Sequence, residues 1–566
     1  MTAHESALPS SEIEPPPVVT RGQTEEEYAI VNVRCLEDFI HKLTNSHKCE
    51  GRIKLSIARK RLISVALNAA CPKCNYTSEA HNMFRENKTE KRGVKQSTLN
   101  LALGTVLQTL PITNSNFIDL TTGIGIDPPS EHGMQKLINK CDAINETLGR
   151  EATDRQVEIA KKRKKRTFEF NVSSDAMYSE GMFAENTPTH AANQAYNTVM
   201  DDTNKVVHIA VYNKHCQRGR LLANKGIDIE CGSTTKKPHD GHCSANLLKH
   251  DPIGHESVYA INAAKCFQKN DNDPTAWTKD GDGAIQKALL EFYGGNIELL
   301  SDEHHVNKAF KKHVRKQEFS SQMLPAKTKR NRQIEVNNFA EDLASRCTIE
   351  IKYARETNKT KQKVIDALKN TDSAVLACIQ GDHSKCDESS FVCDPVGENT
   401  WSFKFLQNKV KIEPTKTDID VIAKHLKFRI GSQALEVLWK GTNTQNCEAF
   451  NRKMRKHLPK NINFTRNVKG RVFSTATFQN RGYKTATQLT HQRVGFVTST
   501  KIQTKTTSHQ RRLSYLKNYQ KTQTAKNARF NVKFEKYQYH RTKNLKLNTD
   551  QTEEEIYEKQ KNLFKK

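Results

Sequence analysis

The chain has 566 residues, with 90 Lys and Arg against 63 Asp and Glu, a formal net charge of +27. This length suffices for about two to four domains with buried cores. No window of about 18 apolar residues occurs, and the N-terminus lacks the basic and apolar segments of a secretion signal, so we expect neither a membrane-spanning nor a secreted protein. The 14 cysteines are therefore expected to be reduced thiols or metal ligands.

The charge surplus favours a polyanionic partner, above all nucleic acid, although a soluble lysine-rich protein would have the same composition. Residues 1–26 are rich in Pro, Ser and Glu and are predicted to be disordered. Residues 27–95 hold strand-like runs at 29–36 and 61–67 among scattered Cys and His, and we predict a zinc-binding module there. Residues 96–166 are predicted to be helical and to bind DNA.

Six consecutive basic residues close this helical region. They indicate either a nuclear localisation signal or a patch that contacts phosphates, but the solvated end of a helix would look the same. The residues assigned to DNA binding are Lys161, Lys162, Arg163, Lys164, Lys165 and Arg166.

The periodicity changes in residues 167–310. Phe168, Phe170 and Val172 alternate with polar residues, which indicates a strand. Further strands are predicted at 206–211, 274–279 and 296–300, separated by helical segments. This alternation predicts an α/β region.

The remainder is predicted to be helical and charged over 311–440, with a further helix within 441–475. Residues 476–566 are predicted to be a basic tail, because residues 481–566 hold 20 basic and 6 acidic residues, a net charge of +14. Its interleaved Tyr and Phe suit flexible contact with nucleic acid. A poorly folded terminus would show the same pattern.

Three acidic residues stand at informative places. Asp175 is predicted to end the first strand, Asp280 to follow a later strand in an Asp-Gly-Asp-Gly turn, and Glu448 to begin a helix. Carboxylates placed in this way can converge at one edge of a sheet and hold a pair of Mg²⁺ or Mn²⁺ ions for phosphoryl transfer. Asp282 is an alternative ligand to Asp280.

Several motifs together resemble the Mutator-like transposases of animal genomes, a branch of the DDE transposases with an RNase H-like core. The resemblance covers about residues 28–475. It rests on Ser173-Ser174-Asp175, His215-Cys216, Cys243-Ser244-Ala245-Asn246, His255-Glu256, Asp280-Gly281-Asp282, His304-His305-Val306-Asn307-Lys308, Gly381-Asp382-His383-Ser384-Lys385-Cys386 and Asn446-Cys447-Glu448-Ala449-Phe450-Asn451.

The resemblance implies that Asp175, Asp280 and Glu448 are the catalytic acids. The 168 residues between Asp280 and Glu448 then imply a mostly helical insertion into the core. The fold expected is an RNase H-like α/β core interrupted by this insertion, with an N-terminal zinc module and a basic tail.

The implied function is a nuclear DNA transposase that binds transposon terminal repeats, hydrolyses a phosphodiester and transfers the strand to target DNA. A homodimer or a larger synaptic assembly is expected by resemblance, since two ends must be joined. Two alternatives stay open. One is a domesticated, catalytically silent DNA-binding protein, and the other is a zinc-stabilised RNA-binding protein.

Two groups of Cys and His have the spacing of structural zinc sites. The ligands predicted for the first are His47, Cys49, Cys71 and Cys74, with Cys35 and His41 as substitutes for the first pair. The ligands predicted for the second are Cys378, His383, Cys386 and Cys393. Four protein ligands leave no open position, so both sites would be structural.

Other Cys and His residues give weaker indications. A further metal site could draw on Cys216, Cys231, Cys243 and Cys266, with His215 and His242 nearby. The family often has a second Cys three residues after the position of Cys216, and Gly219 stands there, which argues against such a site. Cys447 is expected to pack inward. His304 and His305 either line the active site or belong to an acid-capped helix start.

Overall fold

A computed structural model describes most of the chain. The described residues are 28–88, 93, 95–166, 169–179, 192–227, 229–232, 239, 243–281, 283–397, 400–406, 411–460, 462, 464–529 and 531–532. They form two compact units, one of residues up to 104 with 112–137, and one of residues 105–111 with those from 138 onward. The predicted disorder of residues 1–26 lies outside the described residues, as does Asp282.

The first unit contains a small antiparallel sheet covered by a helix. The sheet pairs β1 (Lys54–Arg61) with β2 (Ser64–Cys71), and β2 also pairs with β3 (Tyr76–Thr77) and β4 (His81–Asn82). Its core joins the helix to the sheet through Phe39, Leu43, Val65, Ala69 and Met83. The helices of this unit are α1 (Val33–Ser46), α3 (Asn114–Gly123), the first part of α2 (Thr98–Leu107) and the first residues of α4 (Glu131–Lys164).

The strand predicted over residues 29–36 is wrong, because α1 begins at Val33. The Asn32 side chain accepts hydrogen bonds from the backbone N–H groups of Arg34 and Cys35 and so caps the helix. A cap and the burial of Phe39 and Leu43 on one helix face outweigh the strand propensity of the preceding apolar run.

The second unit is built on a five-stranded mixed sheet in the order β7-β6-β5-β8-β9. The strands are β5 (Asn171–Tyr178), β6 (Gln194–Asp201), β7 (Val206–Asn213), β8 (Ala276–Lys279) and β9 (Glu298–Ser301). β5, β6 and β7 are antiparallel neighbours, whereas β8 and β9 run parallel to β5. The chain is therefore mixed α/β, as predicted.

The predicted strands correspond to β5, β7, β8 and β9, but the sequence did not reveal β6. Every residue of β6 is buried, so it has no exposed polar face and no alternation of apolar and polar residues. The strand also contains buried polar residues, which make its sequence less apolar: Gln194, Asn197, Thr198 and Asp201.

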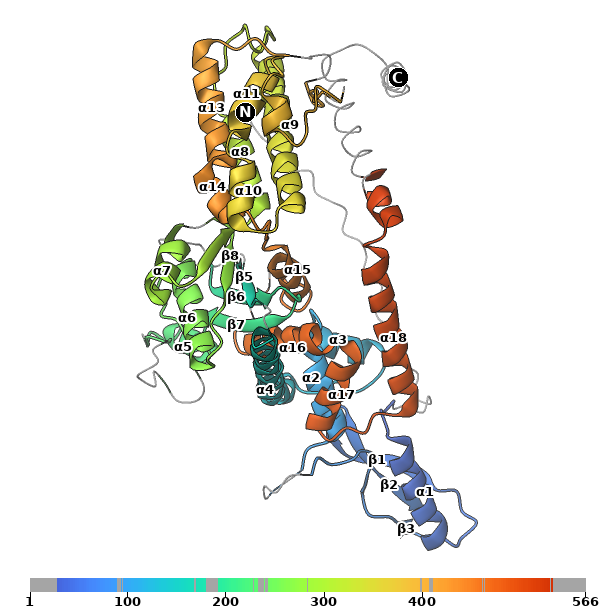
Figure 1. Ribbon diagram of the computed structural model, residues 1–566. Helices are drawn as coiled ribbons and strands as arrows, with labels where there is room; N and C mark the ends of the chain where they lie inside the picture. The colour runs from blue at the N-terminus through green and yellow to red at the C-terminus, as the bar shows by residue number, and fades with distance from the viewer. Residues whose placement is uncertain are drawn as a thin grey trace, which may run out of the picture. The chain divides into compact units, whose positions relative to one another are not determined.

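Helices cover both faces of this sheet (Figure 1). One core joins the sheet to α4 (Glu131–Lys164), α6 (Glu256–Lys269) and α7 (Gly283–Tyr293) around Trp277. The other core joins β5, β6 and β7 to α15 (Gln445–Met454) and α16 (Val468–Arg481) around Phe450 and Phe473. Asp175 and Glu448 thus belong to elements that share a core.

A helical bundle follows β9 and has an apolar core of its own (Figure 1). Its helices are α8 (Glu303–Val314), α9 (Lys329–Thr357), α10 (Lys361–Ala367), α11 (Thr371–Cys378), α12 (Cys386–Ser389), α13 (Lys416–Ile430) and α14 (Ser432–Leu438). The chain returns to the sheet edge at Lys440, whose ammonium pairs with Glu298 on β9 at 2.9 Å and with Glu169 at 2.7 Å.

The segment predicted as a basic tail is helical in its first part. α17 (Tyr483–Arg493) and α18 (Thr500–Tyr519) follow α16 directly. Arg493 pairs with Glu151 on α4 at 2.6 Å, so α17 is held to the second unit. The short remaining helix is α5 (Gln217–Ala223). Among the described residues, no helix combines the length and apolar character needed to cross a bilayer.

Candidate active site and metal-ligand clusters

The register of the sheet brings Asp175 and Asp280 to one edge. β5 and β8 are parallel, with Ser173 opposite Thr278. Continuing this register by two residues places Asp175 opposite Asp280, and neighbouring strands are about 4.8 Å apart. Asp280 follows the last residue of β8, as predicted, but Asp175 lies within β5 and does not end it. β5 extends past Asp175 because β6 pairs with it as far as Tyr178.

The helix α15 carries Glu448 onto this edge. Cys447 is fully buried against the sheet, and its thiol donates to the Ser173 carbonyl at 3.2 Å, so the predicted inward packing is confirmed. One turn further, the Asn451 amide donates to Asp175 Oδ2 at 2.7 Å. Residues three apart on a helix lie on the same face. The hydrogen bond from Asn451 therefore brings the face that carries Glu448 to Asp175.

A buried aspartate fixes the start of the same helix. Asp302, 0% exposed, caps α8 by accepting from His304 N at 2.7 Å. Its other oxygen accepts from the N–H and the hydroxyl of Thr444, the residue before α15, at 2.7 and 2.6 Å. The acid-capped helix start that the sequence suggested is thus present, and it also positions α15.

His305 reaches the proposed site from α8. Its Nε2 lies 3.4 Å from Glu448 Oε1, and both side chains are about one-third exposed. The backbone therefore belongs to a capped helix start, as one of the two readings of this segment predicted. The His305 imidazole contacts Glu448, and whether it lines an active site stays a prediction.

The electrostatics of Asp175 show that several carboxylates surround it. The pKa of Asp175 is raised to about 7, mainly by burial and in addition by the negative charges of Glu256, Asp280 and Glu448. The hydrogen bond from Asn451 opposes this increase. A buried carboxylate among like charges favours the binding of either a proton or a cation.

Glu256 was named in the sequence only as part of a landmark, yet it is the acid with the largest charge effect on Asp175. It is the first residue of α6, and its carboxylate accepts from the Tyr178 hydroxyl at 2.8 Å. Tyr178 lies three residues after Asp175 on β5. The residue type alone gave no signal for this role, because only the fold brings α6 to β5. We call Asp175, Glu256, Asp280 and Glu448 the acid edge.

A sequence model of the Mutator-like transposase family matches residues 27–393 of this chain. The chain belongs to the Mutator-like transposase family. The match includes Asp175 and Asp280 and ends before Glu448. Membership implies a transposase that acts on DNA. A comparison with curated proteins found no match.

The first predicted zinc group of this Mutator-like transposase comes together in the first unit. The ligand atoms of His47, Cys49, Cys71 and Cys74 all lie within 4.8 Å of one another. The thiols of Cys49 and Cys71 are 3.7 Å apart, close to the ~3.8 Å that two thiolates have around tetrahedral zinc. Cys35 and His41, the predicted substitutes, are not part of this group.

Two further observations fit a metal at this site. The Nε2 atom of His47 is buried, and its imidazole interacts with the Cys71 thiol. A Cβ atom on Gly51 would lie 2.6 Å from the Cys71 thiol and 3.0 Å from that of Cys49, so only glycine leaves these thiols room. The four residues suit structural zinc.

The second predicted group closes a loop of the helical bundle. His383 Nδ1 lies 3.3 Å from the Cys393 thiol, 3.5 Å from that of Cys378 and 3.9 Å from that of Cys386. Sulfur and nitrogen ligands of tetrahedral zinc are about 3.6 Å apart. The three thiols are buried, and Trp401 packs against them. These distances suit a structural zinc ion as well.

A buried ion pair on α9 supports this loop. Arg346 and Glu350 are 2.9 Å apart and fully buried. Glu350 accepts from the Ser390 hydroxyl and the Phe391 N–H, both at 2.7 Å. Ser390 lies between Cys386 and Cys393, so α9 holds the segment that carries two of the four ligands.

The acid edge differs from these clusters in its spacing. Among the described residues, the ligand groups that gather within 4.8 Å are made of Cys and His. The carboxylates of the acid edge lie further apart, although their charges still act on Asp175.

At least three residues of the predicted DNA-binding run contact the protein itself. Lys161 and Lys164 donate to the carbonyls of Asn270 and Asp273 at 2.9 and 2.7 Å. Arg163 pairs with Asp202 at 3.4 Å. Lys162 and Lys165 are exposed at the end of α4, and these two side chains are the better candidates for phosphate contact.

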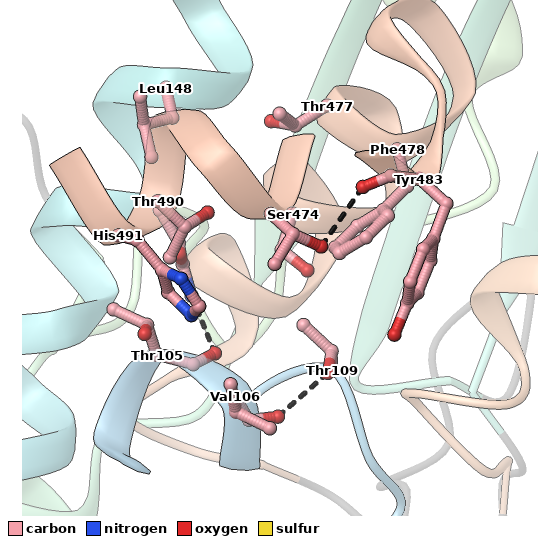
Figure 2. Close-up of a pocket in the computed structure, with 12 residues that line it drawn as sticks. Thr105, Val106, Thr109, Leu148, Ser474, Thr477, Phe478, Tyr483, Thr490 and His491 are labelled. Atoms are coloured by element: carbon pink, nitrogen blue, oxygen red, sulfur yellow. Dashed lines mark hydrogen bonds between the residues drawn. The ribbon is translucent and has the colours of Figure 1, made fainter. Parts of the chain in front are cut away.

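A small pocket lies away from the acid edge, among α4, α16, α17 and the end of α2 (Figure 2). Its walls are mostly hydroxyl-bearing and apolar side chains, with His491 at one side and no carboxylate. The pocket therefore lacks the groups that the chemistry of this family requires.

Proposed function

We propose that the chain is a DDE-type DNA transposase that binds transposon ends, hydrolyses a phosphodiester and transfers the freed strand to target DNA. Membership of the family supports the reaction class. The observation that carries the residue assignment is the hydrogen bond from Asn451 to Asp175, because it joins the helix of Glu448 to the strand of the first acid.

The sheet supports an RNase H-like core for this reaction. Three antiparallel strands followed by two parallel ones, in the order β7-β6-β5-β8-β9, are the arrangement expected of that fold. The helical bundle enters after β9 and leaves before α15, which supports the proposed insertion between the second and third acids.

The donor set of the acid edge suits hard divalent cations. Asp175, Asp280 and Glu448 offer only oxygen ligands, which Mg²⁺ and Mn²⁺ prefer. The raised pKa of Asp175 supports this proposal, because a cation would stabilise the ionised form of this carboxylate. When bound, the cations would activate the attacking water or 3′-hydroxyl and stabilise the leaving oxygen.

The chain's own residues would prepare this site. Asn451 holds the Asp175 carboxylate, and His305 restrains the Glu448 carboxylate. Glu256 adds a fourth negative charge, which favours cations over an empty site. Lys162 and Lys165 would contact DNA phosphates, and the same basic run would direct the protein to the nucleus.

An excision assay tests the proposal. A plasmid carries the element with its own flanking DNA, and excision by the wild type is compared with Asp175→Ala, Glu448→Ala and the matched control Glu291→Ala, whose carboxylate is exposed on α7. We expect the first two variants to lose excision and the control to keep it. Excision by both site variants at wild-type levels would overturn the metal assignment.

A DNA retardation assay separates the alternative function. A wild-type protein that retards the terminal repeats but never excises them, with Mg²⁺ or Mn²⁺ present, would identify a domesticated DNA-binding protein. Retardation lost on raising the salt is expected in either case, since phosphate contacts release counterions.

A further inference from the structure

The connection between β7 and α6 contains a third group of ligands that the sequence argued against. The ligand atoms of Cys216, Cys231, His239 and Cys243 lie within 4.8 Å of one another. Cys216 Sγ is 3.1 Å from His239 Nε2. Neither Cys266 nor His215 belongs to this group, and His242 lies outside the described residues.

We propose that Cys216, Cys231, His239 and Cys243 form a third structural zinc site. Three thiols and one imidazole are a standard zinc ligand set, and their number leaves no open position for catalysis. This site is independent of the acid edge, so it stands or falls separately from the proposed function.

A glycine creates the space for one of the ligands. A Cβ atom on Gly219 would lie 2.4 Å from the Cys231 thiol, closer than any side chain tolerates. Gly219 belongs to α5, which begins directly after Cys216. The family often has a cysteine at the position of Gly219. In this chain the thiol of Cys231 occupies the space beside Gly219, so the spacing of the sequence did not reveal the site.

The backbone around the ligands is fixed by asparagine and serine. Asn213, at the end of β7, donates to the Ser244 carbonyl at 2.8 Å, and Asn246 donates to the Val211 carbonyl at 2.7 Å. The Ser244 hydroxyl donates to the His215 carbonyl at 2.9 Å. The segments that carry Cys216 and Cys243 are therefore joined beside the ligands themselves.

A zinc ion here would order the connection that leads to the acid edge. The same segment continues through Leu247 and Ile253, which pack with Tyr259 of α6 and Ala195 of β6. Glu256 begins α6, directly after this stretch. The zinc ion would thus help to position Glu256 without contacting it.

Metal analysis of the purified full-length protein provides the first test. We expect three zinc ions per chain in the wild type, two in Cys231→Ser and three in the matched control Cys266→Ser. Cys266 is a half-buried thiol on α6 outside the cluster. Equal zinc content in the wild type and Cys231→Ser would overturn the proposal.

A second measurement uses the wild type and so does not depend on the folding of a variant. Alkylation of thiols is followed by mass spectrometry of the peptides, with and without a zinc chelator. We expect Cys216, Cys231 and Cys243 to be protected until the chelator is added, and Cys266 to react equally in both. Cluster thiols that react equally with and without the chelator would overturn the site.

A glycine variant tests the geometry. Gly219→Ala should release one zinc ion at a lower chelator concentration, because its Cβ displaces the Cys231 thiol. Gly123→Ala, where a Cβ meets nothing within 4 Å, is the matched control. Identical zinc release from the two variants would contradict the proposed ligation by Cys231.

Discussion

The acid edge and the Cys/His clusters hold their ligands in opposite ways. At the acid edge, strands and long helices with their own apolar cores position the carboxylates, and Cys447 and Asn451 fasten α15 without any metal. In the clusters, turns and short loops bring thiols together, and glycines such as Gly51 leave them room. We therefore expect cations to serve the proposed chemistry in the first region and the stability of the fold in the second.

Removal of zinc should have the largest effect on the folded structure. Structural zinc contributes about 10 to 16 kcal/mol in small zinc-finger peptides, and the core of the first unit is small. We expect a zinc-selective chelator to make residues 45–80 and 378–406 sensitive to protease, whereas dialysis against buffer without Mg²⁺ leaves their cleavage unchanged. Equal protease sensitivity after both treatments would contradict the proposed difference between the two regions.

The substitution Asp175→Asn should abolish activity without loosening the fold. Loss of one carboxylate ligand should reduce strand cleavage by on the order of 10³-fold or more. Because Asn removes a partly buried charge from among like charges, the free energy of unfolding at pH 8 should rise by about 1 to 3 kcal/mol. Cleavage rates and thermal unfolding measure the two effects, and a fall in both would assign Asp175 a structural role.

Mn²⁺ binding at the acid edge should depend on pH with a midpoint near 7. The pKa of Asp175 is raised to about 7, so below that pH a proton must leave before a cation binds. The affinity should fall about tenfold for each pH unit below 7 and stay constant above it. Isothermal titration between pH 5.5 and 8.5 measures this, and a flat profile would contradict the proton competition.

The fold of the core could be predicted in outline from the sequence, and two metal clusters in detail. Cys71 and Cys74, or His383 and Cys386, are close in sequence, so spacing alone revealed them. Glu256 and His239 could not be found in this way, because their roles depend on elements that meet only in the folded chain. The sequence did not predict β6, because burial on both faces removes the alternation of apolar and polar residues.

The position of Asp175 illustrates the same limit. The sequence places it at the end of its strand, but pairing with β6 extends β5 by three more residues. The sequence also did not predict α1. The helix cap at Asn32 directly follows an apolar run that is typical of a strand.

Glu256→Gln should shift the pH dependence of Mn²⁺ binding at the acid edge without abolishing the binding. Removing this charge lowers the pKa of Asp175, because Glu256 is the carboxylate that raises it most. The midpoint of the pH profile for Mn²⁺ binding should move down by about half a unit to one unit. The control is Glu291→Gln on α7. An unchanged midpoint in Glu256→Gln would contradict an effect of the Glu256 charge on Asp175.

A last prediction concerns the stability effect of a partly buried carboxylate outside both regions. Burial raises the pKa of Asp142 to about 7, and its Oδ1 accepts from Gly470 N at 2.7 Å. The native state therefore resists ionisation, and stability falls as pH rises from about 4 to 7. Asp142→Asn should equal the wild type at pH 4 and exceed it by about 1 to 3 kcal/mol at pH 8, because partial exposure of Asp142 reduces the full linkage effect. A variant less stable at pH 8 would contradict this.

Asp302 gives the helical bundle a common anchorage for its two ends. One of its oxygens holds the chain entering α8, and the other holds Thr444, where the chain leaves for α15. The cost of closing a loop grows only slowly with its length. A bundle inserted in this way can change in length while Asp280 and Glu448, on either side of the anchorage, keep their places.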